Sequence, residues 1–96
     1  MAFYNIYAVK DELTNKFMQP IFIKQEQTAD KEALRIFGHN VNSIPLWKDN
    51  ASDYSFYKLG AFDDMEGILC RGYTDEDGNY REGIQKLASG TAVRKE

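Results

Sequence analysis

Strand-forming segments outnumber helix-forming segments by four to one in this chain, and this imbalance most constrains its fold. Aromatic and β-branched residues dominate residues 3–9, 17–24, 54–62 and 68–73, as is typical of β-strands. Apolar residues recur at helical spacing over one segment, residues 29–41. One helix can cover only one face of a four-stranded sheet, so the other face needs a different partner.

Turn-forming residues between these segments predict how the strands connect. Residues 11–15 can join the first two strands as a hairpin, and residues 63–67 can join the next two. Thr28 precedes the helical segment and is predicted to cap it through its hydroxyl. The sequence therefore predicts an α+β fold in the order β-β-α-β-β, with one main helix on a four-stranded antiparallel sheet.

The end of the chain leaves the element count open. Residues 74–79 form an acidic turn, and residues 81–88 are compatible with a fifth strand or a short helix. A length of 96 residues suits one domain, because a second core would have no chain left to build it. We therefore expect a single domain over residues 1–88 and a flexible tail over residues 89–96, where residues are small or charged.

Both faces of the predicted sheet carry large apolar side chains. Strict alternation places Tyr54, Phe56, Lys58, Gly60 and Phe62 on one face of the third strand and Tyr57 and Leu59 on the other. It likewise separates Phe3, Tyr7 and Val9 from Tyr4, Ile6 and Ala8 in the first strand. The face without the helix must meet a second subunit, the C-terminal tail, or a ligand with flat apolar surfaces.

Single-stranded nucleic acid is such a ligand, because bases stack on exposed aromatic rings while lysine and arginine hold phosphates. Aromatic residues make up 14% of the chain, and several lie beside basic residues. The candidate nucleic-acid-binding residues are Tyr57, Lys58, Tyr7 and Lys10 on the strands, and Lys31 and Arg35 on one stripe of the helix. The alternative is that the rings form the core or a dimer interface and that the helical stripe is simply a solvated face.

The sequence carries no recognisable catalytic motif. His39 and Cys70 are the only histidine and cysteine, and the expected positions are a solvent-facing helix surface and a strand. We therefore expect a protein that is not an enzyme and needs no cofactor or metal. A net charge of -3 also argues against a surface that coats nucleic acid on every side. Without a membrane span or a secretion signal, we expect work in a cytoplasm.

Several residues read together carry a family resemblance. They are Phe17-x-x-Pro20-x-Phe22, Ala33-x-Arg35-x-Phe37 with Val41-Asn42, and Asp53-Tyr54-x-Phe56-Tyr57-x-Leu59-Gly60-x-Phe62-Asp63 with Gly67-Ile68. This pattern resembles the small nonstructural protein of gokushoviruses, which are tailless single-stranded DNA phages of the Microviridae. The resemblance covers about residues 4–69, and its most specific part is the stretch from Tyr57 to Asp63.

The resemblance implies a nonenzymatic phage protein that is made in the cytoplasm of the infected bacterium and is absent from the finished capsid. It implies association with DNA, and a role in diverting replication from duplex synthesis to packaging of single strands. The expected partners are single-stranded DNA and a second copy of the chain, with phage replication or capsid proteins as further candidates. The alternative is a homodimeric adaptor that binds a phage or host replication protein without touching DNA.

Overall fold

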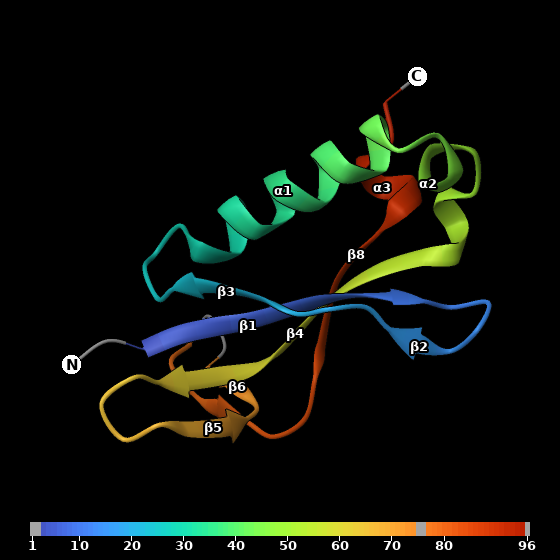
Figure 1. Ribbon diagram of the computed structural model, residues 1–96. Helices are drawn as coiled ribbons and strands as arrows, with labels where there is room; N and C mark the ends of the chain where they lie inside the picture. The colour runs from blue at the N-terminus through green and yellow to red at the C-terminus, as the bar shows by residue number, and fades with distance from the viewer. Residues whose placement is uncertain (1–2, 75–76, 96) are drawn as a thin grey trace.

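The computed structural model describes residues 3–74 and 77–95. Within these residues, a six-stranded antiparallel sheet has its helices on one side (Figure 1). The elements are β1 (Phe3–Asp11), β2 (Lys16–Phe17), β3 (Ile21–Lys24), α1 (Ala29–Ser43), α2 (Pro45–Asp49), the 3-10 helix η1 (Ala51–Asp53), β4 (Tyr54–Asp63), β5 (Ile68–Arg71), β6 (Tyr73–Thr74), β7 (Tyr80–Arg81), β8 (Gln85–Ser89) and α3 (Gly90–Val93).

The long strands β1 and β4 form the centre of the sheet and pair antiparallel along their length. On one side, β2 and β3 pair successively with β1, and on the other, β5 and β8 pair with β4. Strands β6 and β7 form a separate two-stranded sheet. The predicted α+β class and antiparallel sheet are thus confirmed. The predicted numbers of strands and helices are too low, and the predicted order β-β-α-β-β agrees only in part with the structure.

Two segments account for the additional strands. Residues 17–24 divide into β2 and β3, because Pro20 lacks a backbone donor and interrupts the pairing with β1. The chain stays close to β1 at this break, since the amide of Met18 donates to the carbonyl of Val9 at 2.8 Å. Residues 81–88 contribute to β7 and β8 and form no helix. Of the predicted acidic turn 74–79, residues 75 and 76 lie outside the described residues.

Helix α1 presents a buried stripe to the sheet, formed by Ala29, Ala33, Phe37 and Val41 at four-residue spacing. This confirms the predicted helical period. The predicted hydroxyl cap is wrong, because the Thr28 side chain makes no capping bond. Instead, the backbone carbonyl of Thr28 accepts from the Glu32 amide at 2.9 Å.

Stacked aromatic rings form the centre of the core. The Phe56 ring lies 4.9 Å from that of Phe37 on α1 and 5.6 Å from that of Tyr7 on β1, nearly parallel to both. Trp47 of α2 stacks on Tyr54 at 4.9 Å and closes one end of this core. Burial of each large side chain stabilises the fold by about 1.5–3 kcal/mol, so this stack holds α1 on the sheet.

A β-bulge reverses the alternation of side chains halfway along β4. Ile6 pairs with Gly60 and the next residue, Tyr7, pairs with Lys58, so Leu59 is an extra residue in β4. Gly60 and Phe62 therefore lie on the sheet face opposite to that of Phe56 and Lys58. This corrects the strict alternation predicted for residues 54–62, which placed all four on one face.

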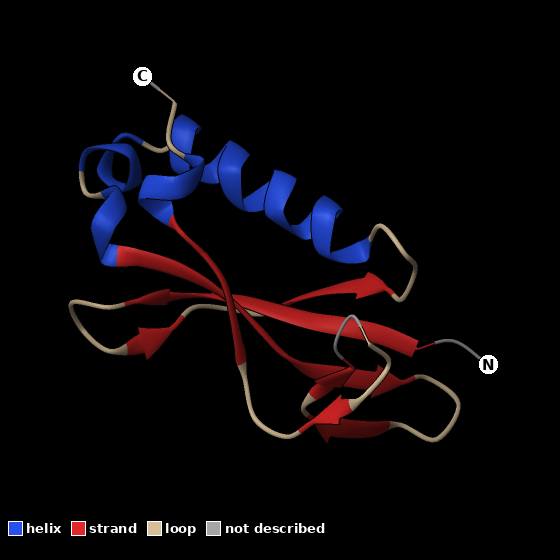
Figure 2. Ribbon diagram, turned by 180° about the vertical axis from the view of Figure 1, so that it is seen from behind, coloured by secondary structure: helices blue, strands red, loops and turns tan. Residues whose placement is uncertain are grey.

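Residues 89–96 are predicted as a flexible tail, and residue 96 lies outside the described residues. Residues 89–95 lie against the helical layer. Gly90 packs so closely on Ala51 that a Cβ at position 90 would lie 2.2 Å from the Ala51 carbonyl oxygen. The Asn42 side-chain amide donates to the Val93 carbonyl at 3.0 Å, and its oxygen accepts from the Lys95 amide at 2.6 Å. This segment therefore completes the layer formed by α1 and α2, on the same side of the sheet (Figure 2).

Candidate nucleic-acid interface

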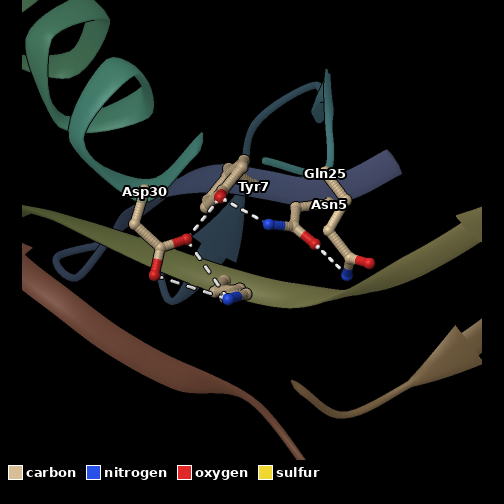
Figure 3. Close-up of polar contacts among 5 residues, drawn as sticks. Asn5, Tyr7, Gln25 and Asp30 are labelled. Carbon is tan, nitrogen blue, oxygen red and sulfur yellow. Dashed lines mark hydrogen bonds and ion pairs between the residues drawn. The ribbon is translucent and has the colours of Figure 1, made fainter. Parts of the chain in front are cut away.

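Two predicted site residues, Tyr7 and Lys58, are buried under α1 on the inner face of the sheet, as we call the face that packs on the helix. The Tyr7 hydroxyl donates to Asp30 of α1 at 2.5 Å, and the Lys58 ammonium lies 3.2 Å from the same carboxylate (Figure 3). Asn5 donates to the Tyr7 oxygen at 3.0 Å and accepts from Gln25 at 3.0 Å.

This polar network ties α1 to the sheet. Burial, and next the hydrogen bond to Asp30, raise the pKa of the Tyr7 phenol well above its ordinary value, so the hydroxyl stays protonated as a donor. Tyr7 is fully buried and Lys58 is 7% exposed, so neither side chain can reach a ligand on the folded surface. This corrects the predicted site, from which both residues are removed.

Lys31 and Arg35 lie on the solvent side of α1, away from the sheet. The Arg35 guanidinium donates two hydrogen bonds to Glu32, at 2.5 and 3.1 Å. These bonds lower the pKa of the Glu32 carboxyl and raise that of Arg35. The helical layer stands between these residues and the far side of the sheet, where Tyr57 and Lys10 lie. The six predicted residues therefore do not form one site.

The face of the sheet that does not pack on α1, called here the outer face, has no helix over it in either view (Figures 1 and 2). Strand pairing assigns its members, because directly paired residues share a face. They are Tyr4, Ile6, Ala8, Lys10, Phe17, Phe22, Lys24, Ser55, Tyr57, Gly60, Phe62, Leu69, Arg71, Lys86 and Ser89.

These positions form four cross-strand rows, and every row combines an aromatic ring with a cationic side chain. The rows are Lys24, Tyr4, Phe62, Leu69; then Phe22, Ile6, Gly60, Arg71; then Ala8, Tyr57, Lys86; and finally Phe17, Lys10, Ser55, Ser89. None of these positions carries a carboxylate. The outer face therefore carries four cationic side chains, and the Glu12 carboxylate contacts it at Tyr57.

Lys10, Phe17 and Tyr57 form a first cluster at one end of the outer face. The Phe17 and Tyr57 rings meet edge to face at 5.5 Å, across the strand that carries Lys10. The Lys10 ammonium lies 5.5 Å from the Phe17 ring centre and 5.9 Å from that of Tyr57. The Glu12 carboxylate accepts a hydrogen bond from the Tyr57 phenol at 3.1 Å.

The Tyr57 phenol is a neutral donor in this cluster. Burial, and next the hydrogen bond to Glu12, raise the pKa of Tyr57 above its ordinary value. The Glu12 contact fixes one edge of the ring, while Phe17 remains 42% exposed beside it. The cluster can therefore offer an oriented aromatic surface next to a cation.

Tyr4, Phe22 and Phe62 form a second cluster toward the other end. The Phe62 ring lies 6.4 Å from Tyr4 and 5.9 Å from Phe22, which meets it edge to face. Phe22 is 49% exposed, and Lys24 pairs with Tyr4 at the sheet edge. This second cluster repeats the combination of rings and a nearby ammonium.

Small or buried side chains separate the two clusters. Ile6 and Ala8 are buried, and Gly60 adds no side chain at all. Gly60 has no room for one, because a Cβ there would lie 2.1 Å from the Cys70 carbonyl oxygen of β5. These positions therefore add little exposed side chain between the two clusters.

Sequence reasoning placed Tyr57 and Lys10 in the candidate site but missed most of the outer face. Phe17, Phe22 and Lys24 lie in the predicted second strand, where strict alternation would place Phe17 on the face opposite to the other two. The break at Pro20 between β2 and β3 brings all three to the outer face. Phe62 and Lys86 owe their places to bulges at Leu59 and Leu87, for which the sequence has no signal.

Among residues 3–74 and 77–95, the structure also bears on metal binding, a cysteine–histidine pair and membrane-spanning helices. In that part of the chain, no cluster of three or more histidine, cysteine or acidic side chains is arranged to hold a metal ion. His39 and Cys70 are both exposed, on α1 and β5, which lie in the upper and lower parts of the molecule in Figure 1. None of the described helices has the length and apolarity needed to cross a bilayer.

Comparison with known proteins identifies the kind of protein to which this fold and surface belong. A family model described as Phage ORF5 protein matches residues 4–73, which span both central strands and α1. The chain therefore belongs to the Phage ORF5 protein family, a phage protein family. No match is found among curated proteins or among solved structures.

Proposed function

We propose that this chain is a nonenzymatic phage nonstructural protein of the gokushovirus type, within the Microviridae, that associates with single-stranded DNA through its outer face. It works in the cytoplasm of the infected bacterium and helps switch genome replication to packaging of single strands. Membership of a phage family supports the broad class. The DNA ligand is proposed from the chemistry of the outer face.

The pairing of a ring and a cation in each cross-strand row carries this proposal. Bases of every kind have flat π faces that stack on aromatic side chains, and the adjoining cations can neutralise the phosphates between them. Rows on one face of a strand repeat every two residues, about 6.6 Å apart. A stacked DNA strand advances only about 3.4 Å per nucleotide, so bases that bind successive rows must be unstacked from each other. The surface thus favours single strands over duplex.

Fluorescence anisotropy with a labelled oligothymidylate across a salt series tests the proposal. The logarithm of the affinity should fall linearly with the logarithm of salt concentration, because bound phosphates release counterions. Tyr57→Ala with Phe22→Ala should weaken binding, while Leu46→Ala, which removes an exposed apolar side chain on α2, should not. Failure of the wild-type protein to bind at low salt would refute DNA as the ligand.

The adaptor alternative draws on a different observation. Met65, Ile68 and Leu69 of the β4–β5 hairpin are 68%, 50% and 66% exposed. Such apolar side chains at the end of a sheet suit a protein contact, with a second copy of the chain or with a phage or host replication protein. Met65→Lys should then abolish that association. Sedimentation of the free protein reports whether a second copy occupies this hairpin.

A further inference from the structure

A second cationic surface lies on the solvent side of the helical layer, across the molecule from the outer face. An open pocket of about 330 Å³ is lined by Arg35, Gly38, His39, Asn42, Val93 and Lys95. An adjoining hollow of about 320 Å³ shares Lys95 and adds Lys48, Asp49 and Arg94. The first pocket contains two permanent cations and a histidine, and no carboxylate lines it.

Tertiary hydrogen bonds build this pocket from segments far apart in the sequence. The Asn42 amide donates to the carbonyls of Gly38, at 2.7 Å, and of Val93, at 3.0 Å. Its oxygen accepts from the Lys95 amide at 2.6 Å. Arg94 adds a bond to the Lys48 carbonyl at 3.3 Å. The residues after α3 are therefore positioned so that Lys95 lies beside the Arg35 and His39 side of α1.

The charges of this surface suit phosphate groups. Arg35 is bonded to Glu32, but both side chains are largely exposed, with 67% and 46% of their side-chain surfaces accessible. An exposed ion pair contributes little stability, so an incoming phosphate can compete for the guanidinium. Lys31 stands one helical turn before Arg35 and is also exposed, with Glu32 between the two in the sequence.

We propose that the pocket formed by Arg35, His39 and Lys95 is a second phosphate-binding site, which holds the backbone of a second stretch of nucleic acid. This inference rests on the proposed function of the outer face, which holds the first stretch through its bases. Because the two sites lie on opposite sides of the sheet, one molecule can bridge two segments of single-stranded DNA. Inorganic phosphate would make the same contacts with this pocket as the phosphates of a DNA backbone, and the experiment below distinguishes these two ligands.

A capture assay tests the bridge. An oligothymidylate of about 20 nucleotides, longer than the about 4–16 nucleotides that such surfaces cover, is fixed to beads and loaded with protein. A second, labelled oligothymidylate is then added and its retention is measured. Arg35→Gln with Lys95→Gln should reduce retention about tenfold or more and leave the affinity for the first oligonucleotide nearly unchanged. Lys16→Gln with Arg81→Gln, with the same loss of charge on β2 and β7, should retain the second strand.

Retention that survives Arg35→Gln with Lys95→Gln would overturn the proposal, since bridging would then come from two molecules that each use an outer face. A parallel titration with inorganic phosphate, followed through the NMR amide signals of Gly38 and His39, examines the pocket without DNA. Shifts of both signals together with second-strand retention support the proposal. If the amide signals shift but the second oligonucleotide is not retained, the pocket binds free phosphate and not DNA. If neither amide signal shifts, the pocket does not bind phosphate. Failure of the first oligonucleotide to bind would instead refute the proposed function.

Discussion

Both faces of the sheet formed by β1 and β4 carry several aromatic side chains, but the packing and exposure of these rings differ between the two faces. On the inner face, Tyr7 and Phe56 stack in parallel, and Phe37 of α1 stacks on Phe56 and covers it. On the outer face, Phe17 and Phe22 meet their neighbours edge to face and stay about half exposed. The difference shows that covering by the helix, and not aromatic content, separates the core from the candidate interface.

The polar groups of the two faces differ in the same way. The inner-face cation, Lys58, is buried and bonded to Asp30, and among the described residues no buried side-chain nitrogen or oxygen lacks a hydrogen-bond partner. The outer-face cation Lys10 lies over two rings, as a phosphate-binding group beside a stacking surface would. The buried cation Lys58 therefore serves stability, whereas Lys10 lies beside the exposed ring of Phe17.

The largest expected effect concerns the inner face. Phe37→Ala should lower the free energy of unfolding by about 3–5 kcal/mol, because it removes the ring that stacks on Phe56 and leaves a cavity. Urea denaturation measures this loss. Phe22→Ala, the matched change on the outer face, should cost far less, since that ring is half exposed. Equal losses for the two variants would contradict the division between the faces.

Loss of a ring from the outer face should act on affinity. Tyr57→Ala should weaken binding of oligothymidylate by about 1–3 kcal/mol, the range for one base stacked on one ring. Anisotropy at fixed salt measures this change, with Leu46→Ala as the control on α2. An unchanged affinity together with a loss of self-association would assign Tyr57 to a protein interface.

The buried phenol of Tyr7 should make stability sensitive to alkaline pH. The pKa of the Tyr7 phenol is raised in the folded state. Below the ordinary tyrosine pKa, the phenol is protonated in both the folded and the unfolded protein, and its contribution to the free energy of unfolding is fully present. Above that pH the unfolded chain releases its proton first, and the free energy of unfolding falls.

Tyr7→Phe isolates this contribution from those of Tyr54 and Tyr57, whose pKa values are also raised. The variant should lose about 1–2 kcal/mol at neutral pH, where the bonds to Asp30 and Asn5 are missing. Its deficit relative to the wild-type protein should shrink as the pH rises above about 10, the ordinary tyrosine pKa. A constant deficit, measured by urea midpoints, would show that Tyr7 ionises normally in the folded state.

The smallest expected effect is a change of salt dependence. Lys24→Gln should reduce the slope of log affinity against log salt by about 0.7, the value for one phosphate contact on a single strand. Lys16→Gln removes the same charge from the neighbouring strand β2, where it pairs with Asp11, and should leave the slope unchanged. A reduced slope for both variants would indicate general electrostatic attraction without a defined surface.

Local patterns in the sequence predicted much of this fold. The four-residue apolar period of α1 and the turn residues around residues 63–67 appear in the structure where the pattern places them. Alternation correctly separated Tyr7 from Tyr4 in β1. These features depend on neighbouring residues alone, and the sequence contains them directly.

Features that depend on contacts between residues far apart in the sequence could not be predicted from local patterns. The bulge at Leu59 depends on how β4 pairs with β1, and it moves Phe62 to the outer face. Burial of Lys58 depends on Asp30, which lies 28 residues earlier in the chain. The C-terminal segment is placed by Asn42, which bonds to residues about 50 positions away. Such contacts become visible only when the sheet register is known.

NMR of the aromatic ring protons tests the central claim most directly. On addition of oligothymidylate, the ring signals of Phe17, Phe22, Tyr57 and Phe62 should shift through stacking with bases, while those of Phe37 and Phe56 should not. Shifts confined to the inner rings, or no ring shifts under conditions in which the oligonucleotide is bound, would contradict the assignment of the outer face as the DNA surface.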